Sequence, residues 1–254
     1  MTESENAAFD LDSHTFQQTG AAHIRESSGN QDVVLCRSGC NLRIFAIADG
    51  QSRKTLSPMG GSAVLRAISD FIEEKGLDAL ASYEYLDELQ YEIMALIRST
   101  LRRLAAQCAA DVQEFASTLV MLAIDPASGR YMTLHLGDGV IISVRQDGEA
   151  GFLSIPENGI TSRYTWLTTS DNALLHLRIS FGNIGGFSRI LLASDGAGCI
   201  CYGKNIPRRS RELIASAGWN EITGYMQENP PEDDASLILI DVAGPESGHG
   251  CLFP

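Results

Sequence analysis

The sequence predicts an α+β fold in which two mainly antiparallel sheets pack face to face and helices cover their outer faces. Three observations support this prediction. Short apolar runs rich in β-branched residues, which are typical of buried strands, recur along the chain. Tight turns join several of these runs, which indicates antiparallel neighbours. Several runs are apolar at every position, so both faces of each sheet must be covered.

Two strands and two helices are expected in the first half of the chain. The strands cover 33–37 and 42–48 and are joined by a hairpin-like turn. The first helix begins with Ser57-Pro58, a favourable cap and first helical residue, and ends at Gly76. A longer helix starts near residue 82. Apolar residues recur in both helices at the spacing that forms one buried stripe.

Strands dominate the second half. We expect them at 115–124, 130–136, 140–145, 151–155, 165–169, 174–180, 189–194 and 236–242, with helices at 207–217 and 221–227 before the last strand. Residues 1–18 are polar and are expected to form a flexible tail. A single domain would then cover 19–243, and a second tail 244–254.

Composition excludes some classes of protein. The net charge of −13 argues against a nucleic-acid-binding protein, which would carry a basic face. No apolar stretch approaches the ~20 residues that span a membrane, and the N-terminus lacks the apolar segment of a signal peptide. We therefore expect a cytoplasmic protein. The six cysteines are expected to be reduced, partly buried thiols; a soft metal site at Cys36, Cys40, Cys199 and Cys201 is the weaker alternative, because no histidine accompanies them.

Acidic residues mark the ends of five apolar runs. Asp49, Asp138 and Asp195 each follow such a run and precede a glycine, whereas Asp32 and Asp233 precede one. Each residue alone is explained by a turn at a strand end, where Asp is favoured. Together at one edge of a sheet they would repel each other, and a hard divalent cation such as Mg²⁺, Mn²⁺ or Ca²⁺ would relieve that repulsion.

Six short motifs resemble, in the same order, those of the metal-dependent protein serine/threonine phosphatases, the protein phosphatase 2C family. The motifs are Gly29-Asn30-Gln31-Asp32, Phe45-Ala46-Ile47-Ala48-Asp49-Gly50, Ala116-Ser117-Thr118-Leu119-Val120, His135-Leu136-Gly137-Asp138-Gly139, Leu191-Leu192-Ala193-Ser194-Asp195-Gly196 and Asp233-Asp234-Ala235-Ser236-Leu237. Each is short, but their order over about residues 20–242 is specific. A histidine nine residues before Asp32 is similar to a compact bacterial branch of the family.

The resemblance implies a four-layer α-β-β-α sandwich with two Mn²⁺ or Mg²⁺ ions between the sheets. Asp49 would bridge both ions, and the Gly50 carbonyl would ligate one of them. Asp195 and Asp233 would hold the other ion, and Asp32 would support the site through water.

Three further residues have assignments with open alternatives. Asp138 matches an acid that helps to hold a third, weaker ion in bacterial members, although a tight hairpin explains it equally well. Arg25 is the candidate hydrogen-bond donor to the substrate phosphate, because guanidinium binds phosphate in bidentate fashion. His23 is a second hydrogen-bond donor or a general acid. Both also fit a surface position. His135, inside a strand, is expected to be a packed histidine.

The sequence departs from the family pattern at two places near the expected site. Gln31 stands where many members have Glu. A neutral amide supplies no charge to the water shell of the second ion, so that ion would bind more weakly. After Gly50 the usual Met-Gly-Gly is replaced by residues 51–55, and Gly60-Gly61 comes only later. Arg53 or Lys54 is therefore an alternative phosphate contact. The family's flap would fall within residues 157–183.

The function that the resemblance implies is hydrolysis of phosphoserine or phosphothreonine on a protein, opposing a bacterial serine/threonine kinase. A metal-activated water would attack phosphorus directly, without a phosphoenzyme. We expect a monomer whose partners are the phosphoprotein and the cognate kinase, with neither nucleic acid nor a membrane involved. The alternatives are a non-enzymatic interaction module that has lost turnover, and a phosphatase for small molecules or nucleotides.

Overall fold

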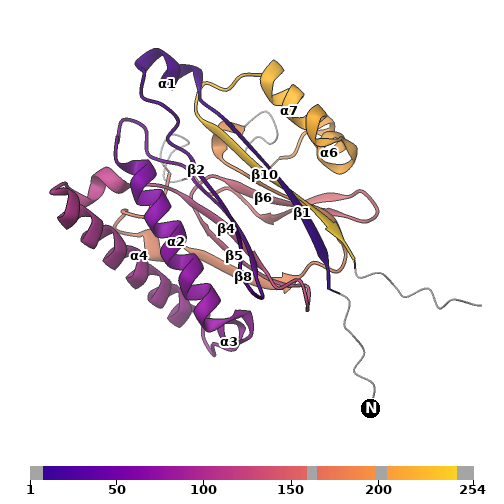
Figure 1. The fold of residues 1–254 in the computed structure, drawn as a ribbon, viewed down its shortest axis with the longest axis horizontal. Helices are drawn as coiled ribbons and strands as arrows, with labels where there is room; N and C mark the ends of the chain where they lie inside the picture. The colour runs from indigo at the N-terminus through magenta and orange to yellow at the C-terminus, as the bar shows by residue number, and fades with distance from the viewer. Residues whose placement is uncertain (1–7, 159–164, 198–204, 245–254) are drawn as a thin grey trace, which may run out of the picture.

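Two five-stranded antiparallel sheets face each other in the computed structural model, which describes residues 8–158, 165–197 and 205–244. Helices cover the outer face of each sheet, so the molecule has four layers, helix–sheet–sheet–helix (Figure 1). The predicted α+β sandwich is confirmed. No helix among the described residues is long and apolar enough to cross a membrane.

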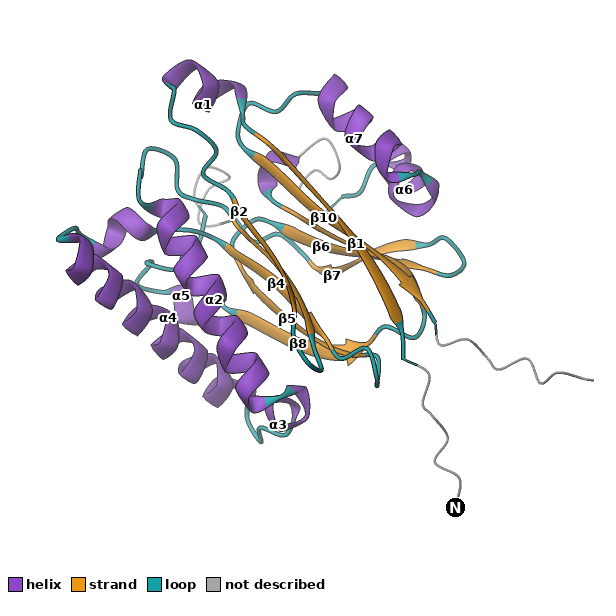
Figure 2. Cartoon of the chain, in the orientation of Figure 1, coloured by secondary structure: helices purple, strands orange, loops and turns teal. Residues whose placement is uncertain are grey.

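The first sheet carries the larger helical layer, as Figure 2 shows. Its strands, in spatial order, are β2 (Val33–Ser38), β3 (Arg43–Ala48), β4 (Leu119–Ile124), β5 (Arg130–Leu136) and β8 (Arg178–Asn183). The helices on its outer face are α2 (Ser57–Lys75), α3 (Leu77–Ala81) and α4 (Leu86–Cys108), with a short 3₁₀ turn, η1 (Val112–Phe115), after them. The two long helices and the hairpin follow the sequence prediction closely.

The second sheet joins the two ends of the chain. In spatial order its strands are β1 (Asp10–Gln18), β10 (Ala235–Ala243), β9 (Phe187–Ala193), β6 (Val140–Arg145) and β7 (Ala150–Ser154). The helices α6 (Arg208–Ser216) and α7 (Trp219–Glu228) cover it. Ile214, Ile222 and Met226 of these helices pack on Leu191 and Leu237 of the sheet.

The inner strands are apolar at every position because both of their faces are covered. In β3, Phe45 and Ile47 lie between the two sheets and pack with residues such as Ile238. Ile44 and Ala46 belong to the opposite face and pack under α2. Burying one such large side chain contributes about 1.5–3 kcal/mol, so these two apolar layers hold the sandwich together.

The expectation of a flexible tail over residues 1–18 is wrong for residues 10–18. This segment is β1, paired with β10 along its whole length from Asp10–Ala243 to Gln18–Ala235. Exposed and half-buried positions largely alternate along the strand, so its exposed face carries the polar residues that suggested a tail. Residues 1–7 and 245–254, most of the expected tails, lie outside the described residues.

Two other local predictions differ from the structure. Instead of a strand at 165–169, only an isolated bridge between Asn158 and Thr165 is present. The segment predicted as a strand at 174–180 divides into a short helix, α5 (Ala173–His176), and the start of β8. A helix that was not predicted, α1 (Ala21–Glu26), precedes β2.

The described cysteines Cys36, Cys40 and Cys108 are free thiols, as predicted, and are exposed rather than partly buried. Cys199, Cys201 and Cys251 lie outside the described residues.

Candidate metal centre

Four of the predicted acids meet at one end of the sandwich. Asp49 follows β3, Asp138 lies between β5 and β6, Asp195 follows β9, and Asp233 precedes β10. Asp49, Asp138 and Asp195 each place a carboxylate oxygen within 4.8 Å of the others. A cavity of about 530 Å³ is lined by all four acids and by Gly50. The strand-end positions therefore converge as the sequence suggested.

Two glycines permit this convergence. A Cβ on Gly196 would lie 1.9 Å from the Asp234 carbonyl oxygen, so only glycine lets the turn after β9 approach the start of β10. A Cβ on Gly50 would lie 2.4 Å from Ser57 Oγ. Gly50 also forms a bridge to Ser117 whose hydrogen bonds use the Asp49 carbonyl and the Gln51 N–H. The Gly50 carbonyl therefore stays outside this bridge, as a ligand oxygen would require.

The electrostatics of the cluster indicate unbalanced negative charge. Burial, followed by the neighbouring charge of Asp195, raises the pKa of Asp49 well above its usual range. The same two causes raise the pKa of Asp138 to about 6. Desolvation disfavours an ionised carboxylate, and a bound cation reverses that penalty. The donor set, made of carboxylates and a main-chain carbonyl, fits a hard divalent ion such as Mg²⁺ or Mn²⁺.

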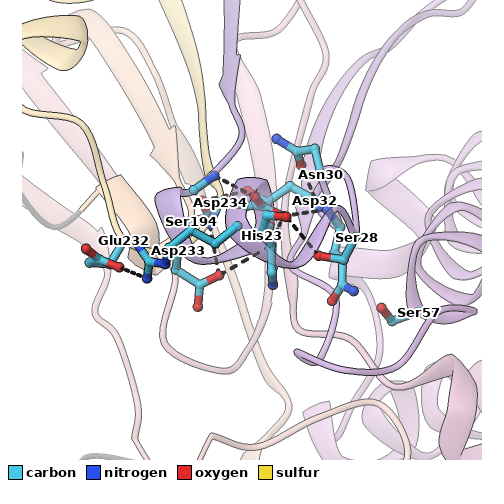
Figure 3. A network of polar contacts seen from close by, with 12 residues as sticks. His23, Ser28, Asn30, Asp32, Ser57, Ser194, Glu232, Asp233 and Asp234 are labelled. Atoms are coloured by element: carbon cyan, nitrogen blue, oxygen red, sulfur yellow. Dashed lines mark hydrogen bonds and ion pairs between the residues drawn. The ribbon is translucent and has the colours of Figure 1, made fainter.

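Asp32 is buried behind the cavity and does not line it. Ser194 Oγ donates a hydrogen bond to Asp32 Oδ2 at 2.9 Å (Figure 3). Ser194 Oγ also accepts a hydrogen bond from Ser236 N–H. Burial raises the pKa of Asp32 to about 7, and the nearby carboxylates add to this effect. This position is compatible with the predicted indirect support of the centre.

Asp233 and Asp234 have opposite environments although they are adjacent in the sequence. The Asp233 side chain is 46% exposed and lines the cavity. The Asp234 side chain is 2% exposed and accepts hydrogen bonds from Gly20 N–H at 2.8 Å and Gln31 N–H at 2.5 Å. Asp234 thus fastens the segment before β2 to the start of β10, a structural role that the sequence analysis did not identify.

The structure does not bring His23 or Arg25 into the cavity lining. His23 is buried on α1, with Nδ1 2.8 Å from Asp234 Oδ2 and 3.9 Å from Asp233 Oδ1 (Figure 3). Arg25 is exposed on the same helix and pairs with Glu232 at 2.8 Å. The short helix has Ser27 as its C-cap, in a left-handed conformation, and Arg25 lies in its last turn.

The altered loop after Gly50 contributes neutral groups to the cavity. Gln51 and Ser52 line it, whereas Lys54 pairs with Glu114 at 2.7 Å and Arg53 is outside the lining. Gly60, displaced along the sequence, lies in α2, where a Cβ would meet the Phe115 carbonyl oxygen at 2.2 Å. It therefore serves close packing of the helix.

Apart from Thr118, which belongs to one of the six motifs, the remaining lining residues could not be recognised from the sequence. They come from η1, the residue before β4 and the segment 165–171: Gln113, Thr118, Thr165, Leu167, Thr169, Ser170 and Asp171. None of the described residues that line the cavity is Lys, Arg or His. Thr165 Oγ1 donates a hydrogen bond to Asp138 Oδ2. Polar residues in a segment without regular structure have no periodic pattern, so only their spatial neighbours reveal them. Residues 159–164, within the range expected for a flap, lie outside the described residues.

His135 is fully buried, as predicted. Its Nδ1 lies 2.6 Å from Ser154 Oγ and 2.9 Å from Arg178 Nη2. Burial and the charge of Arg178 lower the pKa of His135 to about 3, so the ring is neutral at pH 7.

Comparison with known proteins shows the family of the chain. The family model for protein phosphatase 2C matches residues 19–233, and the chain belongs to that family. No curated protein sequence matches it. The fold is similar to that of the serine/threonine phosphatase Stp1 from Staphylococcus aureus, at 13% identity and a TM-score of 0.70, covering 96% of this chain and 100% of that one.

Two other solved structures share the fold at similarly low identity. PppA, a key regulatory component of T6SS in Pseudomonas aeruginosa, has 17% identity and a TM-score of 0.68 over 94% of this chain and 100% of that one. The catalytic domain of the serine/threonine protein phosphatase PstP, solved with two manganese ions, has 18% identity and a TM-score of 0.62 over 93% and 100%. At these identities the likeness concerns the fold alone.

Proposed function

We propose that this protein is a metal-dependent phosphatase that hydrolyses phosphoserine or phosphothreonine on proteins. The observation that carries the proposal is the convergence of Asp49, Asp138 and Asp195 within 4.8 Å, in a cavity that Asp233 also lines. Membership of the protein phosphatase 2C family supports the same chemistry. We further propose that it acts in the cytoplasm, as a monomer, against the products of a bacterial serine/threonine kinase.

The residues divide into metal ligands and supports. Asp49 would lie between two ions, with the Gly50 carbonyl on one and Asp195 and Asp233 on the other. Asp138, held by Thr165, would help to bind a third ion. Asp32 would act through water from behind. Bound Mn²⁺ or Mg²⁺ would supply a water activated at neutral pH and would offset the charge on the phosphoryl group.

Contacts to the substrate phosphate fall mainly to the metal centre in this proposal. Arg25, Lys54 and His23 are each engaged with an acidic side chain and lie outside the cavity lining. The Gln113 amide and the Ser170 hydroxyl are neutral hydrogen-bonding groups on the lining. Arg25 would therefore make a smaller contribution than the sequence suggested.

Hydrolysis of a phosphothreonine peptide with Mn²⁺ tests the proposal. The Asp49→Asn variant should lose more than about 100-fold in kcat/KM, beyond the loss typical of a supporting group near a metal. Asp147→Asn is the matched control, because Asp147 is exposed in the turn at the far end of β6 from Asp138. Absence of metal-stimulated hydrolysis in the wild type would contradict the proposal.

A second candidate is an interaction module that retains the fold and binds metal without efficient turnover. Gln31, a neutral residue buried beside the site, and the cation-free lining of the described cavity favour it. Calorimetric titration with Mn²⁺ separates the two: binding by the wild type without hydrolysis of any phosphopeptide would select the module.

A further inference from the structure

The cavity has a second wall that the metal centre does not use. We call residues Thr165–Asp171 the rim segment; five of them, together with Gln113, line the cavity beside the acids at the strand ends. Asp171 is the one acid in this wall among the described residues. Asp171 is exposed and lines the cavity.

Hydrogen bonds hold the rim segment in place. Thr168 N–H donates to the Ser117 carbonyl at 2.8 Å, and Ser117 N–H donates to Thr168 Oγ1 at 3.2 Å. Gln113 Nε2 donates to the Thr169 carbonyl at 3.3 Å, and Arg98 Nη2 donates to the Asp171 carbonyl at 3.2 Å. The main chain at Asp171 is therefore held at a defined position beside the cavity.

The Asp171 carboxylate has no cationic partner among the described residues. Arg98 contacts its main-chain oxygen, and none of the ion pairs in the described part of the chain includes its side chain. The adjacent side chains of the wall, Ser170, Thr169 and Gln113, are neutral. A carboxylate that is open to the cavity and unpaired can take a cation from a ligand.

The charge of the whole site also favours a ligand that carries a cation. The described lining carries the five carboxylates of Asp49, Asp138, Asp171, Asp195 and Asp233, so a phosphate dianion would add negative charge to an already acidic cavity. No Lys, Arg or His among the described lining residues offsets it. The net charge of −13 also attracts basic substrates over a longer range.

We infer that the preferred substrates are phosphopeptides with Lys or Arg next to the phosphoresidue, and that Asp171 is the specificity-determining residue that binds this cation. The inference rests on the proposed function. An exposed ion pair of this kind contributes up to about fivefold in kcat/KM, and added salt weakens it.

The test compares three phosphothreonine peptides that differ only in the residues flanking the phosphothreonine, which are Arg, Ala or Glu. We expect kcat/KM to fall in that order for the wild type with Mn²⁺. The measured quantity is the ratio of kcat/KM for the Arg peptide to that for the Glu peptide within each variant, because a loss of folded or metal-loaded protein cancels in this ratio. Asp171→Asn should lower the ratio about threefold to fivefold, and Asp171→Lys should lower it further.

Asp147→Asn removes the same charge far from the cavity and should leave the ratio unchanged. A wild-type ratio near one, or a ratio that Asp171→Asn does not lower, would overturn the inference while the proposed function stands. Failure to hydrolyse the peptides and p-nitrophenyl phosphate alike would instead overturn the proposed function, and the inference with it.

Discussion

Asp233 and Asp234 are adjacent residues with opposite environments, and their difference separates the candidate metal centre from the structure around it. Asp234 is buried, main-chain N–H groups satisfy its carboxylate, and His23 Nδ1 lies 2.8 Å from it. Asp233 lines the cavity beside Asp195. Burial, and to a smaller extent the negative charge of Asp195, raise the pKa of Asp233. A carboxylate that the protein itself satisfies stabilises the fold, whereas one left among other acids is available to a cation.

The sharpest test of this comparison is the pair Asp234→Asn and Asp233→Asn. Asp234→Asn replaces one acceptor oxygen by an NH₂ donor, which would face a main-chain N–H donor in a buried position. We therefore expect a loss of about 3 kcal/mol in the free energy of unfolding. In the wild type, Asp234 N–H donates a hydrogen bond to Asp233 Oδ1 at 2.9 Å. Asp233→Asn keeps an oxygen that can accept this bond, so it should change the free energy of unfolding by less than about 1 kcal/mol.

Thermal denaturation of metal-free protein measures the stability of both variants, and calorimetric titration measures their affinity for Mn²⁺. Asp233→Asn should weaken Mn²⁺ binding by about 10- to 100-fold. Equal loss of stability in the two variants would contradict the division of roles.

The pH dependence of stability extends the comparison to the rest of the centre. In metal-free protein the pKa of Asp138 is raised to about 6 and that of Asp32 to about 7. The folded state then binds more protons than the unfolded state between about pH 4 and 7. The free energy of unfolding should therefore fall as the pH rises through this window, by up to about 7 kcal/mol in total, because each pKa unit corresponds to about 1.4 kcal/mol.

Urea denaturation at several pH values measures this slope, with and without Mn²⁺. Saturating Mn²⁺ binds the deprotonated carboxylates of the folded state and should flatten or reverse the slope. A metal-free stability that rises steadily from pH 4 to pH 7 would show that these acids are satisfied like Asp234.

The smallest expected effect is that of Arg25→Ala. Arg25 is exposed and its guanidinium is paired with Glu232, so we expect less than a twofold change in the KM for a phosphopeptide. Steady-state kinetics with the phosphothreonine peptide and Mn²⁺ measure it. An increase in KM of tenfold or more would show that Arg25 does bind the substrate phosphate.

Local patterns were sufficient to predict which acids lie close together at the candidate metal centre. Asp49, Asp138 and Asp195 lie at strand ends that apolar runs and glycines mark, so their types and spacing were visible in the sequence. The choice between Asp233 and Asp234 rested on the family motif, because both directly precede the same strand. The structure separates them by the N–H groups of Gly20 and Gln31, which are over 200 residues away in the sequence.

The sequence by itself determined the two-sheet sandwich, the two long helices and the strand-end acids, because these depend on apolar periodicity and turn residues within short windows. Only the tertiary structure decided that Asp10–Gln18 is a strand, since its partner β10 lies at the other end of the chain. It also decided that Arg25 faces Glu232 and that Asp171 reaches the cavity. Such contacts depend on packing between distant segments, and that packing leaves no local pattern in the sequence.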